Sequence, residues 1–116
     1  MKFQYNIRTE KIETVPFIFF EGDMTSDSDA EMKKIYASLK EESELKTLVI
    51  NFEKTQYINS SGIATLIHII QDMNEKQFKL IFVGLTEHFK NVMEIVGLKD
   101  FATIVDTSQE ALQIAK

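Results

Sequence analysis

The fold is organised around the stretch Tyr57-Ile58-Asn59-Ser60-Ser61-Gly62-Ile63-Ala64-Thr65-Leu66. An apolar strand predicted over residues 45–52 leads toward it, and an apolar helical pattern over residues 63–73 leads away from it. A serine between them stands at the start of a helix, where the first backbone N–H groups lack partners and the helix dipole is positive. That position suits an N-cap. It also suits a phosphoryl group, because anions are stabilised there.

The composition is that of a globular domain. The chain has 116 residues, 44% hydrophobic and 27% charged, with a net charge of −5, so we expect one domain spanning residues 1–116. The acidic balance and the lack of a basic stripe argue against nucleic-acid binding. The absence of cysteine excludes disulfides and thiol catalysis. With no signal-peptide segment and no membrane-length apolar run, we expect a cytoplasmic protein that does not insert into a membrane.

The apolar periodicity predicts two strands, then three helix–strand units and a last helix. An alternating strand at residues 3–8, a turn at 11–14 and a strand at 15–20, ending at 21–23, form a hairpin. Further strands are predicted at residues 45–52, 79–83 and 101–105, with a loop at 54–56 before the second helix. Alternating strands and helices favour parallel pairing with right-handed crossovers. The predicted fold class is therefore α/β, with a mostly parallel central sheet, an N-terminal hairpin and four helices.

Local signals predict where the helices begin and end. Residues 25–28 offer several N-cap candidates for the first helix, and Ser28 with Glu31 has the spacing of a capping box. This helix is expected to end at residues 42–44. Thr86 and Thr107 are predicted to cap the third and fourth helices. Gly97 is placed as the residue just beyond the third helix, where glycine is favoured. The third helix is predicted to include residue 96 in its apolar stripe.

Few side chains offer catalytic chemistry. His68 and His88 do not have the spacing of a metal site. The scattered glycines form no nucleotide-binding loop, and no nucleophile elbow is present. We therefore expect no enzyme activity, no cofactor and no metal. The acidic residues of the first half, among them Asp23 and Asp29, are interpreted as a solvated face, with a surface for a basic partner as the alternative.

The Ser-Ser-Gly turn at residues 60–62 has two interpretations. In the structural one, a serine hydroxyl caps the helix, which is worth about 0.5–2 kcal/mol. Gly62 then allows a tight turn or the close approach of another surface. In the functional one, Ser60 is a phosphorylated switch.

The strand Leu48-Val49-Ile50-Asn51-Phe52 and the stretch from Tyr57 to Leu66 resemble the central motif of the STAS domain family. The commonest form of that motif is an apolar strand, then Asp-Ser-Ser/Ala-Gly-Leu-Gly and a helix. The order of elements is similar along the whole chain, and a free-standing domain of this length resembles a bacterial anti-sigma factor antagonist. Two positions depart from the family pattern. Asn59 replaces the usual aspartate, and Thr25 stands where an acidic residue is frequent.

The resemblance implies a regulatory role in transcription by partner switching. Ser60 would be phosphorylated by a protein serine kinase that is itself the anti-sigma factor, and a protein serine phosphatase would remove the phosphate. The unphosphorylated form would bind the kinase and free the sigma factor. The alternative is a STAS scaffold, or a subunit of a signalling or transport assembly, that is never phosphorylated. An enzyme or small-ligand protein has no support beyond a polar crevice near strand ends.

One partner-binding surface is expected, because loops that follow neighbouring parallel strands lie side by side. Its predicted residues are Gly22, Asp23, Met24, Thr25, Asn59, Ser60, Ser61, Gly62, Ile63 and Ile69. Of the isoleucines of this helix, Ile69 is expected to be more exposed than Ile63. The partner's identity, the regulated process and the oligomeric state stay open.

Overall fold

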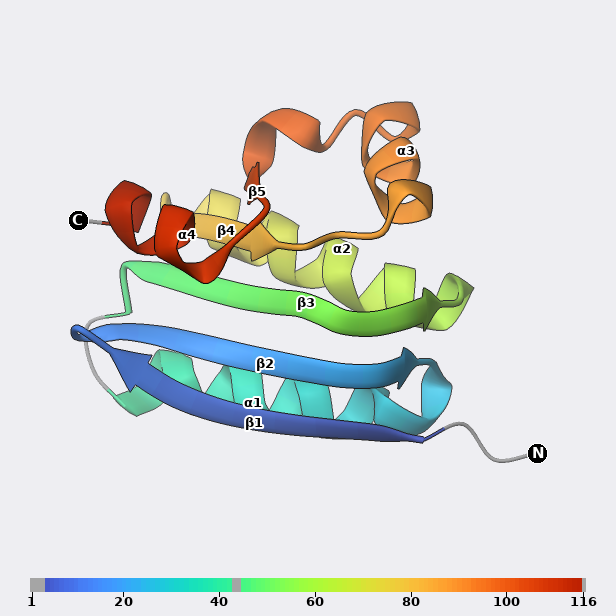
Figure 1. Cartoon of the computed structure of the whole chain (residues 1–116), viewed down its shortest axis with the longest axis horizontal. Helices are drawn as coiled ribbons and strands as arrows, with labels where there is room; N and C mark the ends of the chain where they lie inside the picture. Colours follow the sequence, from blue (N-terminus) through green and yellow to red (C-terminus); the bar gives the residue numbers. More distant parts are fainter. Residues whose placement is uncertain (1–3, 43–44, 116) are drawn as a thin grey trace.

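The computed structural model describes residues 4–42 and 45–115, where a five-stranded sheet in the order β1-β2-β3-β4-β5 carries four α-helices (Figure 1). The elements are β1 (Tyr5–Ile12), β2 (Val15–Met24), α1 (Ser26–Glu42), β3 (Thr47–Ile58), α2 (Ser60–Glu75), β4 (Lys79–Val83), α3 (Glu87–Ile95), the 3₁₀ helix η1 (Lys99–Phe101), β5 (Thr103–Val105) and α4 (Ser108–Ala115). β1 pairs antiparallel with β2, and all other neighbours are parallel. The predicted α/β class is confirmed. The predictions for residues 3 and 43–44 lie outside the described residues.

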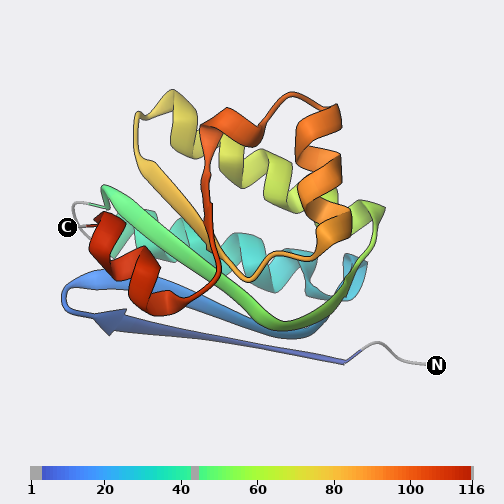
Figure 2. The ribbon, with the colours of Figure 1, turned by 45° about the horizontal axis from the view of Figure 1, so that its top comes forward.

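The sheet is covered on both faces. α1 and α2 lie on one face and α4 on the other (Figures 1 and 2). The larger core lies under α1, α2 and α3, and aromatic contacts cross it from Phe20 to Phe52, Phe82 and Phe89, with ring centroids 5.8–6.3 Å apart. The smaller core lies between the sheet and α4, around the fully buried Ala111. This double cover explains why the central strands are almost wholly apolar.

The loop predicted at residues 54–56 is wrong, because β3 continues through it to Ile58. The register against β2 shifts twice, so that Phe19 pairs with Asn51 while Glu21 pairs with Lys54. These irregularities insert extra residues into β3 and let its polar side chains reach solvent without ending the pairing. Thr55 is buried at the bulge and donates its hydroxyl to the Phe20 carbonyl at 2.8 Å. β2 likewise runs on to Met24, beyond its predicted end.

Other element ends were only partly predicted. The hairpin turn is shorter than residues 11–14, because only Glu13 and Thr14 leave the ladder, both with positive φ. Such a two-residue turn matches the right-handed twist of the strands. The strand predicted over residues 101–105 begins only at Thr103, because η1 precedes it. Val96 lies beyond α3 and is 48% exposed, so its predicted place in the apolar stripe is wrong.

Three of the four predicted caps are confirmed at the predicted residues. Thr86 accepts from the Phe89 N–H, Thr107 accepts from the Glu110 N–H, and Gly97 follows α3 with φ 76°. For α1 only the range of candidates, residues 25–28, is confirmed, because Ser28 of the capping box is buried inside the first turn instead of preceding it.

Of the candidates at residues 25–28, Thr25, the residue before α1, is the one that caps the helix. The Thr25 hydroxyl accepts from the Asp27 N–H at 3.2 Å, and the Ser28 hydroxyl oxygen accepts from the Thr25 N–H at 3.3 Å. Together these bonds satisfy backbone donors at the helix start.

α1 and α2 lie side by side and run in the same direction. Near their carboxyl ends, Asp72 of α2 accepts from the Tyr36 hydroxyl at 2.6 Å and pairs with Lys40 at 2.9 Å and Lys76 at 2.8 Å. The hydrogen bonds from Lys76 and Tyr36 hold the pKa of Asp72 well below its ordinary value. Burial, together with the bond to Asp72, raises the pKa of Tyr36. This polar cluster fixes one end of the helix pair, and a second polar contact fixes the other.

Candidate functional site

The site lies at the carboxyl ends of the neighbouring parallel strands β2 and β3. Asp23 pairs with Tyr57 and Met24 with Ile58, and the Asn59 N–H donates to the Met24 carbonyl at 3.1 Å. The structure therefore places residues 22–25 beside residues 59–62, as the parallel order predicted. Parallel sheets commonly present functional groups at this edge, where loops from several strands converge.

Asn59, rather than a serine, caps α2. Its side-chain oxygen accepts from the Gly62 N–H at 3.0 Å, and its carbonyl accepts from the Ile63 N–H at 2.9 Å. The expectation that a serine hydroxyl is the cap is wrong, because α2 begins at Ser60 and the two serines occupy its first two positions. Asparagine caps as well as aspartate does, since either side chain offers the oxygen that the helix N–H requires.

The end of β2 lies close to α2 at Gly62. A Cβ on this residue would lie 2.6 Å from the Met24 carbonyl oxygen and 2.9 Å from the Met24 Cγ. Real Cβ atoms do not approach other atoms so closely. The absence of a side chain therefore allows the end of β2 to pack against the first turn of α2, which supports the predicted close approach of another surface.

The two adjacent serines have different surroundings. Ser60 is exposed, and its hydroxyl forms no hydrogen bond with any residue in the described part of the chain. Ser61 is half-buried and donates its hydroxyl to Asp29 Oδ2 in the first turn of α1. Thr65, one turn further along α2, donates to Asp29 Oδ1 at 2.8 Å. Ser60 is thus the hydroxyl that a second protein can reach without breaking an existing contact.

The electrostatics of the first turn favour an anion at Ser60. The first turn of α2 contains no acidic side chain. The partial positive charge of the helix N-terminus is therefore not offset by the helix's own residues. The N–H groups of the first turn that the cap leaves free point out of the helix end, which is the arrangement that binds phosphate groups.

The predicted partner-binding residues differ in accessibility. Ser60 is exposed, and Gly22, Asp23, Asn59, Ser61 and Ile63 are half-buried. Met24 is fully buried, Thr25 is 2% exposed, and Gly62 is buried. These three residues are therefore not accessible to a partner and lie beneath the accessible ones.

The expected exposure of Ile69 is wrong. Its exposed fraction is 0%, whereas Ile63 is half-buried. The reason is that α2 packs against both the sheet and α1, so a side chain on either flank is covered.

Two residues of this region were not identified from the sequence. Asp29 was interpreted as part of a solvated acidic face, and no periodic signal distinguishes it from its acidic neighbours. Tyr57 is 47% exposed at the end of β3. Its orientation follows from the bulges in β3, which strand alternation alone does not reveal.

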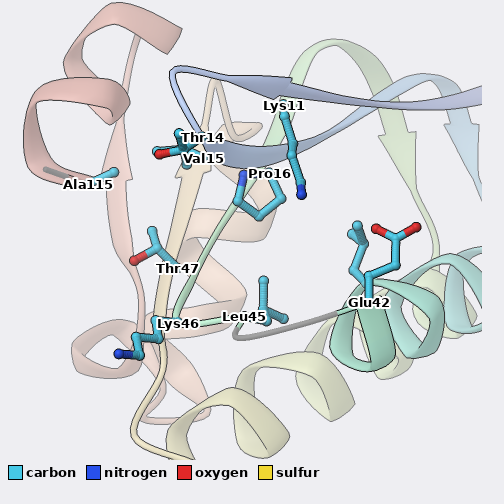
Figure 3. Close-up of a pocket in the computed structure, with 10 residues that line it drawn as sticks. Lys11, Thr14, Val15, Pro16, Glu42, Leu45, Lys46, Thr47 and Ala115 are labelled. Atoms are coloured by element: carbon cyan, nitrogen blue, oxygen red, sulfur yellow. The ribbon is translucent and has the colours of Figure 1, made fainter.

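Other parts of the molecule offer less chemistry. A pocket lies near the amino ends of β2 and β3, the end of the parallel strands opposite Ser60, with Lys11, Glu42 and Lys46 among its lining residues (Figure 3). Within residues 4–42 and 45–115, no group of histidine and acidic side chains has an arrangement able to hold a metal ion. His68 and His88 are both exposed. In the same ranges, no helix is long and apolar enough to cross a membrane.

Comparisons with known proteins concern the family and the fold. The family model described as STAS domain matches residues 6–111. The anti-sigma-B factor antagonist of Staphylococcus aureus is 20% identical over 95 residues, covering 82% of this chain and 87% of the relative.

Two solved structures show the likeness of the fold. The anti-sigma factor antagonist SpoIIAA in its unphosphorylated form aligns with a TM-score of 0.78 and 15% identity, over 95% of this chain and 96% of that chain. The Bacillus cell fate determinant SpoIIAA in the phosphorylated form aligns with a TM-score of 0.73 and 16% identity, over 99% and 100%. At these identities the two likenesses establish the fold alone.

Proposed function

This chain belongs to the STAS domain family, and we propose that it is an anti-sigma factor antagonist-like regulatory module controlled by phosphorylation of Ser60. A protein serine kinase that is also the anti-sigma factor modifies Ser60, and a protein serine phosphatase restores the hydroxyl. The unphosphorylated form binds the kinase and frees the sigma factor. The relatives named as antagonists support this proposal, as does a structural neighbour solved in both phosphorylated and unphosphorylated forms. In this role the chain is a substrate and a binding module, not an enzyme.

The observation that carries the proposal is the hydroxyl of Ser60 at the first position of α2, which makes no hydrogen bond to a described residue. It is exposed, it lies outside the hydrogen-bond network of Ser61, and it lies beside backbone N–H groups at a helix N-terminus. A kinase can reach this hydroxyl without unfolding the helix. The product is compatible with the fold because a helix N-terminus stabilises an anion.

The proposed reaction is phosphoryl transfer from a nucleoside triphosphate. The Ser60 oxygen forms a bond to the γ-phosphorus, the bond from that phosphorus to the β–γ bridging oxygen breaks, and the nucleoside diphosphate leaves with the electron pair. A base on the kinase receives the hydroxyl proton. The new group carries about −1.5 to −2 charges. Its bulk and charge then oppose docking of a partner surface that had accepted a neutral hydroxyl.

The proposed docking surface is built around the accessible residues of the site. Asn59 precedes Ser60, Asp23 lies at the neighbouring strand end where it pairs with Tyr57, and Ile63 offers a half-buried apolar contact one turn along α2. Ser61 and Gly22 are the remaining accessible residues of this surface. The buried residues Met24, Thr25 and Gly62 pack beneath it.

The alternative is a STAS scaffold or assembly subunit that never carries phosphate. Asn59 favours it, because a kinase that reads a carboxylate at this position finds an uncharged amide. The cap itself does not discriminate, since Asn59 makes the bond to the Gly62 N–H that an aspartate would make.

The test uses ATP and a kinase of the anti-sigma factor class from the organism that encodes this chain. Mass spectrometry should locate the phosphate on Ser60. Pull-down with the same kinase should be strong for the wild type and for Ser60→Ala and lost for Ser60→Asp. Ser26→Asp is the matched control, because Ser26 is an exposed serine at the first position of α1, and it should bind like the wild type. Absence of phosphate from Ser60, or equal binding by Ser60→Asp, rejects the proposal in favour of the scaffold.

A further inference from the structure

Asp29 is bound by two hydroxyls of α2. Ser61 donates to one carboxylate oxygen, and Thr65 donates to the other at 2.8 Å. Ser61 and Thr65 are four residues apart, so they lie on the same face of the helix, the face toward α1. No described lysine, arginine or histidine forms an ion pair with Asp29. Its charge is therefore stabilised by hydrogen bonds from neutral groups and by the N-terminus of α1, in whose first turn it lies, with no described cation paired to it.

Ser60 lies outside this contact. Successive residues of an α-helix are rotated by about 100°, so the first and second positions of α2 face different directions. The second faces Asp29, whereas the first is exposed and makes no hydrogen bond to a described residue. Two chemically identical side chains, adjacent in sequence, thus differ in their distance from a carboxylate.

We propose that Asp29 is the residue that determines which of the two serines is modified, by excluding a phosphoryl group from Ser61 and leaving Ser60 as the acceptor. This inference rests on the proposed phosphorylation of the site. Phosphorylation of Ser61 would replace the hydroxyl hydrogen through which Ser61 donates its hydrogen bond to Asp29. It would also place a multiply charged anion against a carboxylate that has no cation beside it, an arrangement that like-charge repulsion disfavours. Asp29 is a positioning residue, because it acts through the Ser61 hydroxyl.

The kinase-independent test installs phosphoserine at position 60 or 61 of the full chain during synthesis, in the wild type and in Asp29→Asn. Asparagine keeps the shape and one oxygen acceptor but removes the charge. We expect phosphoserine at 61 to lower the melting temperature by about 5 °C or more in the wild type and by about half of that or less in Asp29→Asn. Phosphoserine at 60 should change it by about 2 °C or less in both backgrounds.

A purely structural contact between α1 and α2 gives a different result. In that case Asp29→Asn would lower the melting temperature equally with and without phosphate, so the two changes would be additive. Thr65→Val is the matched control, because it removes one hydrogen bond to Asp29 but leaves the charge, and the cost of phosphoserine at 61 should persist in it. Additivity, or an equal cost of phosphate at 60 and 61, overturns the inference.

A second measurement uses the anti-sigma factor-class kinase and ATP on Ser60→Ala chains. Phosphate on Ser61 should rise about tenfold or more when Asp29→Asn is added, because the repelling charge is gone. A fall would mean that Asp29 instead activates Ser61 by accepting its proton, which also overturns the inference. Failure of the kinase to modify Ser60 in the wild type would reject the proposed function, while the phosphoserine comparison would still decide the role of Asp29.

Discussion

Replacing Gly62 by alanine should destabilise this protein, although the same change inside a helix usually stabilises it. Alanine is favoured over glycine in a helix interior by about 1 kcal/mol, and it also reduces the entropy of the unfolded chain. At Gly62 the added Cβ would lie 2.6 Å from the Met24 carbonyl oxygen. Whether alanine raises or lowers the free energy of unfolding therefore depends on whether the cost of that close contact exceeds the gain in helix propensity.

The close contact outweighs the helix propensity because the atoms that it involves cannot all move away. The Met24 side chain, whose Cγ would be 2.9 Å away, can rotate, but its carbonyl belongs to the end of β2 and accepts from the Asn59 N–H at 3.1 Å. Moving it strains the bond that joins β2 to the start of α2. Forcing extra atoms into a packed site costs about 1–3 kcal/mol. After subtraction of the propensity gain of about 1 kcal/mol, a net loss of up to about 2 kcal/mol is expected.

Urea and thermal denaturation of Gly62→Ala measure this loss, which corresponds to a fall of up to about 8 °C in melting temperature. Ala64→Gly is the matched control, because Ala64 is exposed in the same helix and the change reports the propensity alone. That control should lose about 1 kcal/mol. If Gly62→Ala instead gains as much stability as Ala64→Gly loses, the close approach of β2 does not constrain this position and the reasoning is refuted.

Two further predictions concern the cap of α2 and the polar cluster at the other end of the helix pair. In urea titrations, Asn59→Ala should lower the free energy of unfolding by about 0.5–2 kcal/mol, because the Gly62 N–H loses its acceptor. Asn59→Asp should keep the stability of the wild type, because aspartate offers the same acceptor. Equal losses for both variants would contradict the capping role. For Asp72, hydrogen bonds from Lys76 and Tyr36 lower the folded-state pKa, so its contribution to stability is complete above the ordinary aspartate pKa of about 4 and is lost as the pH falls below it. Stability measured between pH 6 and pH 2 should fall less steeply in Asp72→Asn than in the wild type, and identical slopes would exclude this contribution.

Local sequence signals predicted the caps well because each cap involves only neighbouring residues. Thr86 bonds the N–H three positions along, and Gly97 adopts positive φ immediately after α3. For α1 the local signals left several candidates at residues 25–28, because several hydroxyl and acidic residues near the start of this helix can cap it. Thr25 forms the cap, because it directly follows the end of β2 and directly precedes the helix.

Pairing between strands decided what local patterns did not. Residues 54–56 are polar enough to suggest a loop, yet β2 extends alongside them and keeps them in the sheet through two register shifts. The burial of Ile69 has a similar origin, because two neighbours of α2 cover both flanks of its apolar stripe. The apolar pattern of one helix does not specify which other elements will pack against that helix.

The sequence by itself determined the order of strands and helices, the parallel sheet, and the position of Ser60 at the start of a helix beside the end of β2. These features follow from apolar periodicity and chain connectivity, which act over short distances along the chain. The tertiary structure alone decided that the Met24 carbonyl lies against Gly62 and that Asp29 binds the Ser61 hydroxyl while Ser60 makes no hydrogen bond to a described residue. The difference between the two serines arises from a contact between residues 32 positions apart, which exists only when α1 and α2 pack side by side on the sheet.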